Sequence, residues 1–388
     1  MGILCCKRKS KSKDELPQLP SQQSPLLTNN TSICSSSSTI IHNKCGINDF
    51  TFLKYLGKGT YGQVALVRYI PNSKLYAMKI LDKKLIAKYA QIIHTKTERD
   101  LLVKVNHPFI VNLIFAFQDR SRLYFVTEFM QGGELFFHLH KEHFFSNEQT
   151  KQLICEIILA LEHIHKEGFI YRDLKPENIL LDINGHIHLT DFGLSIFMPT
   201  KHKAYTICGT PQYLAPEILK GDGYDNSVDW WSLGVLMFEM LSGKLPFKFG
   251  RNEVLTFERY EYEMKRFDVP MNFTKEAGRL IKELLVVKPK KRLGYGKNGV
   301  KYIKQHKYFD GVDWEDVYNK KVKMMFRPVV NGEEDLSNFS KEFTMMKIPE
   351  EWVNKEGDNV KDDKNDDEQN DYVGFSYQEG NIMDNCKE

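Results

Sequence analysis

Four short segments between residues 50 and 130 carry the hydrophobic pattern of β-strands. In residues 52–56, 63–69, 75–81 and 123–127, apolar side chains alternate with polar ones or form short runs. A period of two turns one face of a strand toward a core. Between the third and fourth segments, residues 92–104 have apolar or long side chains at helical spacing. This part of the chain is expected to form a small β-rich lobe with one helix.

Helical spacing dominates after Gly133. Apolar residues recur every three or four positions in residues 148–165, 226–241 and 274–286, as in helices that bury one face. The pattern therefore predicts the α+β fold class, with a small β-rich lobe followed by a larger helical lobe.

The composition changes at both ends of the chain. Residues 1–45 begin with basic side chains and continue with Ser, Pro, Gln, Asn and Thr, whereas residues 353–371 are acidic and polar. Such segments cannot bury enough apolar surface to fold, so we expect disorder in the first and flexibility in the second. The acidic segment leads into the aromatic cluster 372–377, which needs a partner surface.

The overall composition excludes several classes of protein. A length of 388 residues suits one large two-lobed domain with tails. The 54 Lys and Arg against 51 Asp and Glu leave a net charge of +3, too balanced for a bulk nucleic-acid binder. No apolar run reaches the roughly 18 residues of a membrane helix. We expect no signal peptide, and seven scattered cysteines without metal-ligand spacing indicate reduced thiols.

A glycine-rich loop joins the first two predicted strands. Gly57, Gly59 and Gly62, followed by Val64, form a GxGxxGxV pattern, and glycines let a backbone approach phosphate oxygens. By itself the pattern fits a simple glycine hairpin equally well. A dinucleotide-binding fold is excluded because no helix follows the loop.

The third predicted strand carries a lysine that could bind the same phosphate oxygens. Lys79 lies two positions after Ala77 in this strand, and the small side chain of Ala77 leaves room for a purine. Glu98 on the following helix can orient the lysine. A lysine in an amphipathic strand is otherwise a surface residue, so this reading depends on the chemistry downstream.

The strongest chemical signal is the segment 171–178, with sequence YRDLKPEN, followed by the DFG motif at 191–193. Asp173 can accept a proton from an attacking hydroxyl, and Lys175 can neutralise charge on a transferred phosphoryl group. Asn178 and Asp191 can hold divalent cations. Single loop acids are usually only solvated, but an ordered set at these spacings favours phosphoryl transfer.

These motifs together resemble the eukaryotic protein kinase family over residues 50–309. The glycine loop, the strand lysine, the helix glutamate, YRDLKPEN, DFG and the Ala-Pro-Glu segment at 215–217 appear in the family's order. Within that family the chain is similar to the AGC group, including ribosomal S6 kinases, Akt and serum- and glucocorticoid-induced kinases. The tyrosine at 171, the TICGTP segment at 206–211 and the aromatic C-terminal cluster are typical of that group.

The resemblance implies a bilobal fold, with a small lobe at about 50–127 and a large lobe at about 131–309. A tail over 310–388 would wrap the lobes and carry a hydrophobic motif at 372–377. It also implies ATP and Mg²⁺ as cofactors, with Asp173 as the base, Lys175 as the electrostatic stabiliser, and Asn178 and Asp191 as metal ligands. The expected nucleotide-site residues are Gly57, Lys58, Gly59, Thr60, Tyr61, Gly62, Val64, Ala77, Lys79, Glu98, Thr127, Glu128, Met130, Glu134, Glu177 and Leu180.

The resemblance also suggests a substrate class. The carboxylates expected to receive basic residues upstream of the phosphoacceptor are those of Glu134, Glu177 and Glu239. An apolar pocket just after the acceptor would be lined by Ile207, Pro211 and Leu214. The protein would then phosphorylate Ser or Thr in basic motifs; the alternative is that these acids are ordinary surface charges.

Two phosphorylation switches follow from the same likeness. Thr206 is the expected activation-loop site, whose phosphate would pair with Arg172 and His94. Ser376 is the expected hydrophobic-motif site, and an upstream activating kinase would dock on this motif or on its groove. The intervening turn-motif phosphosite has no clear counterpart, because residues 348–352 read Ile-Pro-Glu-Glu-Trp.

The N-terminus suggests attachment to an anionic membrane surface. Gly2 can be myristoylated and Cys5 and Cys6 palmitoylated, although Cys6 stands where the myristoylation pattern has Ser or Thr. Five basic residues follow, and one acyl chain with a basic patch anchors a protein. The alternative is a disordered basic tail. We expect a cytoplasmic monomer that binds no nucleic acid, and the rival functions are a pseudokinase scaffold and a kinase of lipids or small molecules.

Overall fold

The computed structural model describes residues 45–59, 62–199, 202–247, 256–353 and 371–379. The expected acylation sites lie outside these ranges, as do the segment 1–45 expected to be disordered, apart from residue 45, and the expected flexible segment 353–371, apart from its two end residues. Within them, no helix is both long enough and apolar enough to cross a membrane.

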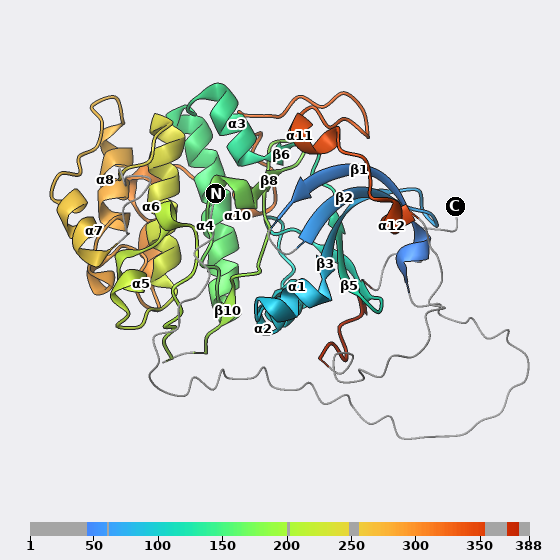
Figure 1. The fold of residues 1–388 in the computed structure, drawn as a ribbon. Helices are drawn as coiled ribbons and strands as arrows, with labels where there is room; N and C mark the ends of the chain where they lie inside the picture. Colours follow the sequence, from blue (N-terminus) through green and yellow to red (C-terminus); the bar gives the residue numbers. More distant parts are fainter. Residues whose placement is uncertain (1–44, 60–61, 200–201, 248–255, 354–370, 380–388) are drawn as a thin grey trace, which may run out of the picture.

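A six-stranded antiparallel sheet forms the small lobe (Figure 1). Its strand order is β1 (Phe50–Lys58), β2 (Gly62–Tyr69), β3 (Leu75–Asp82), β5 (Arg122–Glu128), β4 (Leu113–Gln118) and β11 (Tyr377–Gln378). The four predicted strands are confirmed, and so is the predicted helix, α2 (Ile92–Lys104), which follows the short helix α1 (Lys83–Lys88). Strand β4 escaped prediction because its Leu-Ile-Phe-Ala-Phe run is buried throughout and shows no alternation.

Three long helices build the large lobe where helical spacing predicted them. They are α4 (Asn147–Lys166), α6 (Ser227–Ser242) and α8 (Lys275–Leu284). Helix α4 begins with a capping box, in which Ser146 accepts a bond from the backbone N–H of Gln149 and the Gln149 side chain accepts one in return. Shorter elements surround them: α3 (Leu135–Glu142), α5 (Pro216–Lys220), α7 (Phe257–Met264), α9 (Gly299–Lys304), α10 (Trp314–Tyr318), β6 (Gly133–Glu134), β7 (Phe169–Ile170), β8 (Ile179–Leu181), β9 (Ile187–Leu189) and β10 (Ile196–Phe197).

A buried ion pair joins two distant motifs of the large lobe. Arg292 places Nη1 2.7 Å from Oε1 of Glu217 and Nη2 2.9 Å from Oε2, a bidentate geometry. The two side chains are 0% and 8% exposed. Glu217 is the second residue of α5, and the expected substrate-pocket residues Pro211 and Leu214 come shortly before it, so the pair fixes the end of that loop to the helical core.

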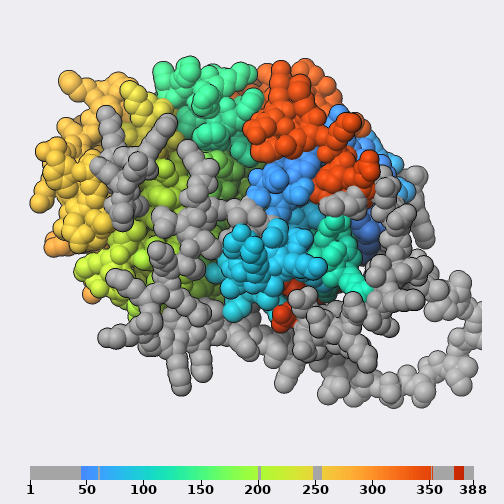
Figure 2. All heavy atoms as spheres, in the orientation of Figure 1, coloured from blue at the N-terminus to red at the C-terminus, as the bar shows by residue number. Residues whose placement is uncertain are grey.

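The C-terminal tail returns from the large lobe to the small lobe. Helices α11 (Lys341–Thr344) and α12 (Glu350–Val353) lie against β1 (Figures 1 and 2). After the undescribed residues, β11 adds to the sheet edge at β4, with Tyr377 opposite Ala116. The tail therefore contacts the sheet at two separate places, and the predicted two-lobed α+β fold is confirmed.

Candidate active site

A cavity of about 480 Å³ lies between the lobes and collects most of the residues expected to hold nucleotide and metal. From the small lobe and the connection between lobes come Gly57, Lys58, Gly59, Gly62, Val64, Ala77, Lys79, Glu98, Thr127, Met130 and Glu134. From the large lobe come Asp173, Lys175, Glu177, Asn178, Leu180 and Asp191. Thr60 and Tyr61 lie outside the described residues.

The glycine-rich loop is a tight hairpin at the roof of the cavity. The backbone N–H of Gly59 donates to the carbonyl of Gly62 over 2.8 Å. A Cβ atom on Gly62 would lie 2.5 Å from the carbonyl oxygen of Ile80 on β3. Glycine is therefore required at position 62 by the close approach of β3, whatever the loop binds.

Lys79 connects the two sides of the cavity. Its ammonium lies 2.7 Å from Oε1 of Glu98 on α2 and 2.9 Å from Oδ1 of Asp191 in the large lobe. Burial lowers the pKa of Lys79, but Asp191 and Glu98 outweigh it and raise the pKa above its ordinary value. Lys79 in turn holds the pKa of the Asp191 carboxyl below its usual range. Both groups are thus charged at neutral pH.

Asp173 is the most restrained carboxylate at the floor of the cavity. Its Oδ1 accepts bonds from the backbone N–H and the hydroxyl of Thr210, over 3.1 and 2.8 Å. Its Oδ2 accepts from Nδ2 of Asn178 over 2.9 Å and lies 2.8 Å from Nζ of Lys175. The carboxylate is 5% exposed, so it can turn little without breaking these contacts.

The backbone around this carboxylate is held in an unusual conformation. Arg172 has a φ of 69° and Asp191 a φ of 54°, values that cost conformational energy and recur at functional sites. Asp229, at the start of α6, accepts the backbone N–H groups of Tyr171 and Arg172 over 3.0 and 2.8 Å. A buried carboxylate of the helical core thereby stabilises the strained loop.

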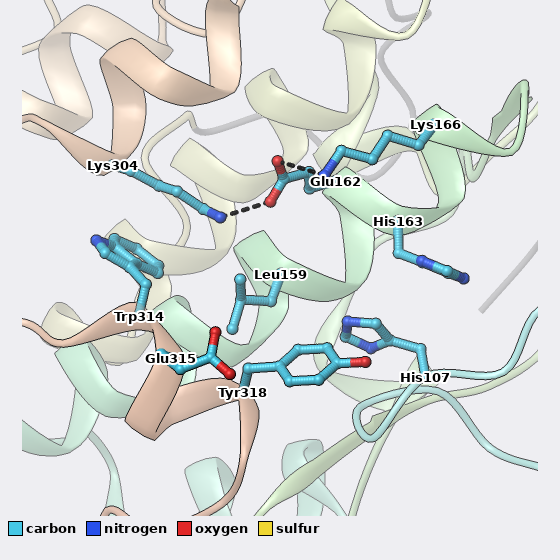
Figure 3. A pocket seen from close by; sticks show the side chains of 9 residues that line it. All are labelled: His107, Leu159, Glu162, His163, Lys166, Lys304, Trp314, Glu315 and Tyr318. Carbon is cyan, nitrogen blue, oxygen red and sulfur yellow. Dashed lines mark hydrogen bonds and ion pairs between the residues drawn. The ribbon is translucent and has the colours of Figure 1, made fainter.

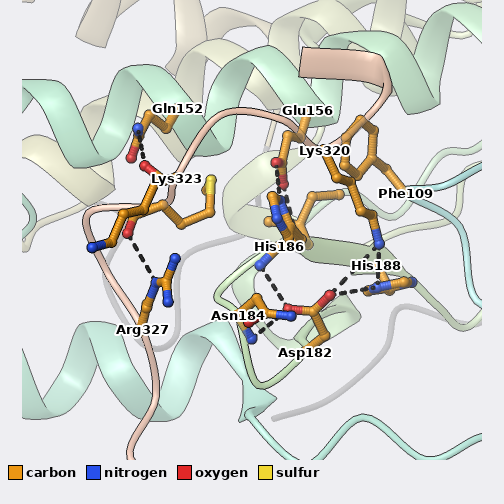
Figure 4. A network of polar contacts seen from close by, with 12 residues as sticks. Phe109, Gln152, Glu156, Asp182, Asn184, His186, His188, Lys320, Lys323 and Arg327 are labelled. Carbon is orange, nitrogen blue, oxygen red and sulfur yellow. Dashed lines mark hydrogen bonds and ion pairs between the residues drawn. The ribbon is translucent and has the colours of Figure 1, made fainter. Parts of the chain in front are cut away.

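The tail contacts the β8–β9 hairpin (Figure 4). This hairpin joins the two expected metal ligands. Lys320 lies 3.3 Å from Nε2 of His188 and 3.6 Å from the carboxylate of Asp182. His186 contacts Glu156 of α4 over 2.6 Å. These contacts anchor the hairpin to both α4 and the segment after α10.

The rim of the cavity includes two aromatic residues that were not predicted to line it. Phe129 lies between the lobes, and Phe339 of the tail stacks on it with ring centroids 5.6 Å apart. Glu128, in contrast, is not among the residues that line the cavity, and its backbone N–H donates to Asn112. The position of Phe339 depends on how the tail folds back, which no local pattern reports.

Of the expected substrate acids, Glu134 and Glu177 line the cavity, whereas Glu239 does not. Tyr213 donates its hydroxyl to the carboxylate of Glu239. Burial, helped by the charge of Glu177, raises the pKa of Glu239 to about 7 despite this bond. Burial and the same neighbour raise the pKa of Glu134 to about 7. Neighbouring carboxylates repel one another, and an arriving cation relieves that repulsion.

Thr206 lies close to a buried guanidinium. Its carbonyl accepts the hydroxyl of Tyr224 over 2.7 Å, and Nη1 of Arg172 donates to the same Tyr224 oxygen over 2.9 Å. The other amino group of Arg172, Nη2, is buried without a partner in the described part of the chain. Burial and the charge of Arg172 lower the pKa of His94 to about 4.

The hydrophobic cluster 372–377 docks beside α2 and β4. Phe375 and Tyr372 are buried. Gln118 donates to the carbonyl of Tyr372 over 2.9 Å, and Arg99 of α2 donates to the carbonyl of Gly374. The partner surface that the composition required is therefore the small lobe itself.

A second cavity, of about 240 Å³, lies between α4, α9 and α10 (Figure 3). Its lysines Lys166 and Lys304 both pair with Glu162, over 2.9 and 2.5 Å. Of the described residues expected in catalysis, none lines it. The cavity between the lobes is therefore the candidate active site.

Comparison with known proteins agrees with this geometry. The family model for the protein kinase domain matches residues 50–309. The chain belongs to the protein kinase family. A second family model, for the protein kinase C terminal domain, matches residues 330–377 of this kinase's tail. Family members use ATP and Mg²⁺.

Several curated proteins are similar to this kinase. Human ribosomal protein S6 kinase alpha-3 is 46% identical over 308 residues, covering 78% of this chain and 41% of the relative. The RAC serine/threonine-protein kinase of Drosophila melanogaster is 45% identical over 312 residues (80% and 50%). The serine/threonine-protein kinase AtPK1/AtPK6 of Arabidopsis thaliana is 41% identical over 303 residues (78% and 64%). The aligned part thus spans 41% to 64% of these relatives, and the predicted likeness to AGC kinases is confirmed.

The residues in the cavity suit a nucleotide with a divalent cation. Asn178 uses Nδ2 to bond Asp173, which leaves its amide oxygen as the group available to a metal. That oxygen and the ionised carboxylate of Asp191 are the hard ligands that Mg²⁺ prefers. The ammonium of Lys79 adds a fixed positive charge for phosphate oxygens.

Proposed function

We propose that the chain is an active serine/threonine protein kinase, which transfers the γ-phosphoryl group of ATP to protein hydroxyls. The observation that carries this proposal is the convergence of Lys79, Asp173, Asn178 and Asp191 on one cavity. We assign the small lobe to about 50–127, the large lobe to about 131–309 and the tail to 310–388.

Asp173 is the group proposed to receive the proton. As the substrate oxygen bonds to the γ-phosphorus and the bond to the β-phosphate oxygen breaks, the hydroxyl proton passes to this carboxylate. The bonds from Thr210 and Asn178 hold the carboxylate in one orientation, so little reorganisation accompanies the transfer.

Lys175 and Lys79 are the fixed cations of the proposed reaction. Lys175 lies 2.8 Å from Asp173, where it can neutralise charge that develops on the transferred group. Lys79 would hold the non-transferred phosphates. Asn178 and Asp191 would hold Mg²⁺, which would supply further neutralisation of the phosphate oxygens.

Substrates are proposed to carry basic residues before the phosphoacceptor. Burial, with the charge of Glu177, raises the pKa values of Glu134 and Glu239; an arriving cation would favour their ionised forms, and arginine can pair with such carboxylates bidentately. An apolar residue after the acceptor would meet Ile207, Pro211 and Leu214. A position-scanning peptide library should lose signal when the upstream arginines become alanine.

Phosphates on Thr206 and Ser376 are proposed to activate the kinase. The unpaired amino group of Arg172 supports the first site, because a phosphate there would complete its bonding. Ser376 is exposed on a cluster already docked on the small lobe, which supports the second site and docking by an upstream kinase. Phosphosite mapping of the active protein tests both.

A single assay separates the proposed function from its rivals. Radiolabelled ATP with an arginine-rich serine peptide should label the peptide, and phosphoamino-acid analysis should find phosphoserine. A pseudokinase scaffold predicts no labelling, and a lipid kinase predicts labelling of lipid vesicles instead. The Asp191→Asn protein serves as the blank, because it lacks a proposed metal ligand.

Attachment to an anionic membrane through Gly2, Cys5 and Cys6 also stays a proposal, supported only by the sequence pattern. Intact-mass measurement of the protein from its native cell, beside the Gly2→Ala and Cys5→Ser variants, would detect the acyl chains. An unmodified mass would contradict it.

A further inference from the structure

The segment 340–353 has no part in the proposed reaction, yet it packs closely against the small lobe. It occupies the place in the tail where the resemblance implies a phosphorylated turn motif. Residues 345–353 read Met-Met-Lys-Ile-Pro-Glu-Glu-Trp-Val and contain no Ser, Thr or Tyr. Residues 345–353 are therefore not held by a phosphate of their own; Ser340 and Thr344 precede them.

The segment is held by Trp352. This side chain is 5% exposed and belongs to the apolar cluster on the outer face of the sheet. Its ring stacks on Tyr55 with centroids 5.7 Å apart and an angle of 13°, and lies 5.5 Å from the ring of Phe52. Phe343 of α11 approaches the same Tyr55 ring at 6.5 Å. Aromatic rings at these separations attract one another beyond the effect of burial.

The contacts of Trp352 lie directly behind the glycine-rich hairpin. Tyr55 immediately precedes Leu56 and Gly57, which line the nucleotide cavity. The Tyr55 hydroxyl donates to Oε1 of Gln63 over 2.6 Å, across the β1–β2 pair. Trp352 thus contacts the strand that carries the roof of the site, on the face opposite the cavity.

The other end of the segment reaches the cavity itself. Asn338 donates through Nδ2 to the carbonyls of Gln131 and Val329, over 3.3 and 3.0 Å. The next residue, Phe339, lines the nucleotide cavity and stacks on Phe129. Residues 340–351 connect this rim to Trp352, and Figure 2 shows the orange-red atoms of the tail packed against the blue atoms of the small lobe.

We propose that Trp352 fastens the tail to the small lobe by apolar contact, without a phosphate on residues 345–353, and so keeps Phe339 at the rim of the nucleotide site. Trp352 is then a positioning residue, which acts on the nucleotide through Phe339. A tail that came loose would have to be ordered again each time nucleotide binds, and that ordering weakens affinity. The inference rests on the proposed function, since Mg²⁺ and ATP are its ligands.

The test compares two tryptophans of the same tail. Trp352→Ala should weaken binding of ATP with Mg²⁺, measured by calorimetry on the full chain, by roughly five- to tenfold. Trp352→Phe should recover most of the loss. Trp314→Ala removes a half-buried tryptophan on the large lobe and should leave nucleotide affinity unchanged. If Trp352→Ala does not fold, Phe343→Ala probes the same face with a smaller expected effect.

Hydrogen exchange gives a readout that needs no catalysis. Residues 336–347 should exchange faster in Trp352→Ala than in Trp314→Ala, and phosphatase treatment of the unmutated protein should not change their protection. Equal affinity in the two alanine variants would overturn the positioning role. Loss of protection after phosphatase would overturn the phosphate-independent anchor. Failure of the unmutated protein to bind ATP would refute the proposed function, while exchange would still report on the anchor.

Discussion

The two lobes hold their shares of the active site in different ways. In the large lobe, Asp173 accepts bonds from Thr210 and Asn178 and contacts Lys175, and the loop around it is fixed by the helical core. In the small lobe, Lys79 has one partner on its own side, Glu98, and another across the cavity.

The difference separates chemistry from nucleotide positioning. The proposed base is arranged before any substrate arrives, because its bonds come from residues of a single lobe. Lys79 and Phe339, in contrast, are placed by contacts between lobes or by the returning tail. Damage to the large-lobe loop should therefore reduce turnover, whereas damage to the small lobe should also reduce nucleotide affinity.

The largest effect is expected for Asp173→Asn. The amide keeps the shape of the carboxylate but is not a base, so kcat should fall by about 10²–10⁴-fold, while ATP affinity stays nearly unchanged. Turnover of radiolabelled ATP and a binding titration measure the two quantities. Asp310→Asn, at an exposed position, is the control. Near-normal turnover would remove Asp173 from its proposed role.

Breaking the Arg292–Glu217 pair should show how much the large-lobe frame contributes. Arg292→Leu leaves a buried carboxylate without its cation, which should cost ~3–5 kcal/mol in the free energy of unfolding. Denaturant titration measures it. Arg279→Leu removes an exposed i,i+4 pair with Glu283 and should change stability little. Equal losses in both variants would contradict the structural role assigned to the buried pair.

The small-lobe contact is tested by Glu98→Gln. Lys79 would keep Asp191 but lose its orienting carboxylate, and loss of one charged hydrogen bond should lower kcat/KM by about 10–100-fold. Steady-state kinetics with varied ATP should place much of this loss in KM. Asp100→Asn on the same helix is the matched control. A loss confined to kcat would contradict the proposed division between a large lobe that sets turnover and a small lobe that also sets nucleotide affinity.

The smallest expected effect is a pH dependence of substrate binding. Because burial raises the pKa of Glu239 to about 7, this carboxyl is largely protonated near pH 6 and ionised near pH 8. KM for an arginine-containing peptide should therefore fall by about three- to tenfold over that range as pH rises. Glu239→Gln should reduce the pH dependence and leave the part due to Glu134, whose pKa is also raised to about 7; a rise in KM with pH would contradict the assignment.

The sequence predicted the local elements of the fold well, because alternation and helical spacing record which face is buried. The strands around the glycine-rich loop and helices α2, α4, α6 and α8 lie where expected. Strand β4 was missed because a strand buried on both faces lacks alternation. The two-residue β11 is too short to carry a pattern of its own.

Motif spacing indicated the residue types of the site but not all of their partners. Asp173 and Asn178 were predicted from the segment 171–178 and Asp191 from the DFG motif, and all three line one cavity. The contact of Lys79 with Asp191, the pairing of Arg292 with Glu217 and the stacking of the tail on Phe129 are tertiary contacts. They depend on how distant segments pack, which spacing along the chain does not encode.

The central claim is most directly tested by a crystal structure with Mn²⁺ and a non-hydrolysable ATP analogue. We expect the triphosphate between the lobes, near Lys79, and an anomalous peak about 2.2 Å from oxygen atoms of Asp191 and Asn178. A nucleotide bound elsewhere, or a metal that touches neither residue, would contradict it.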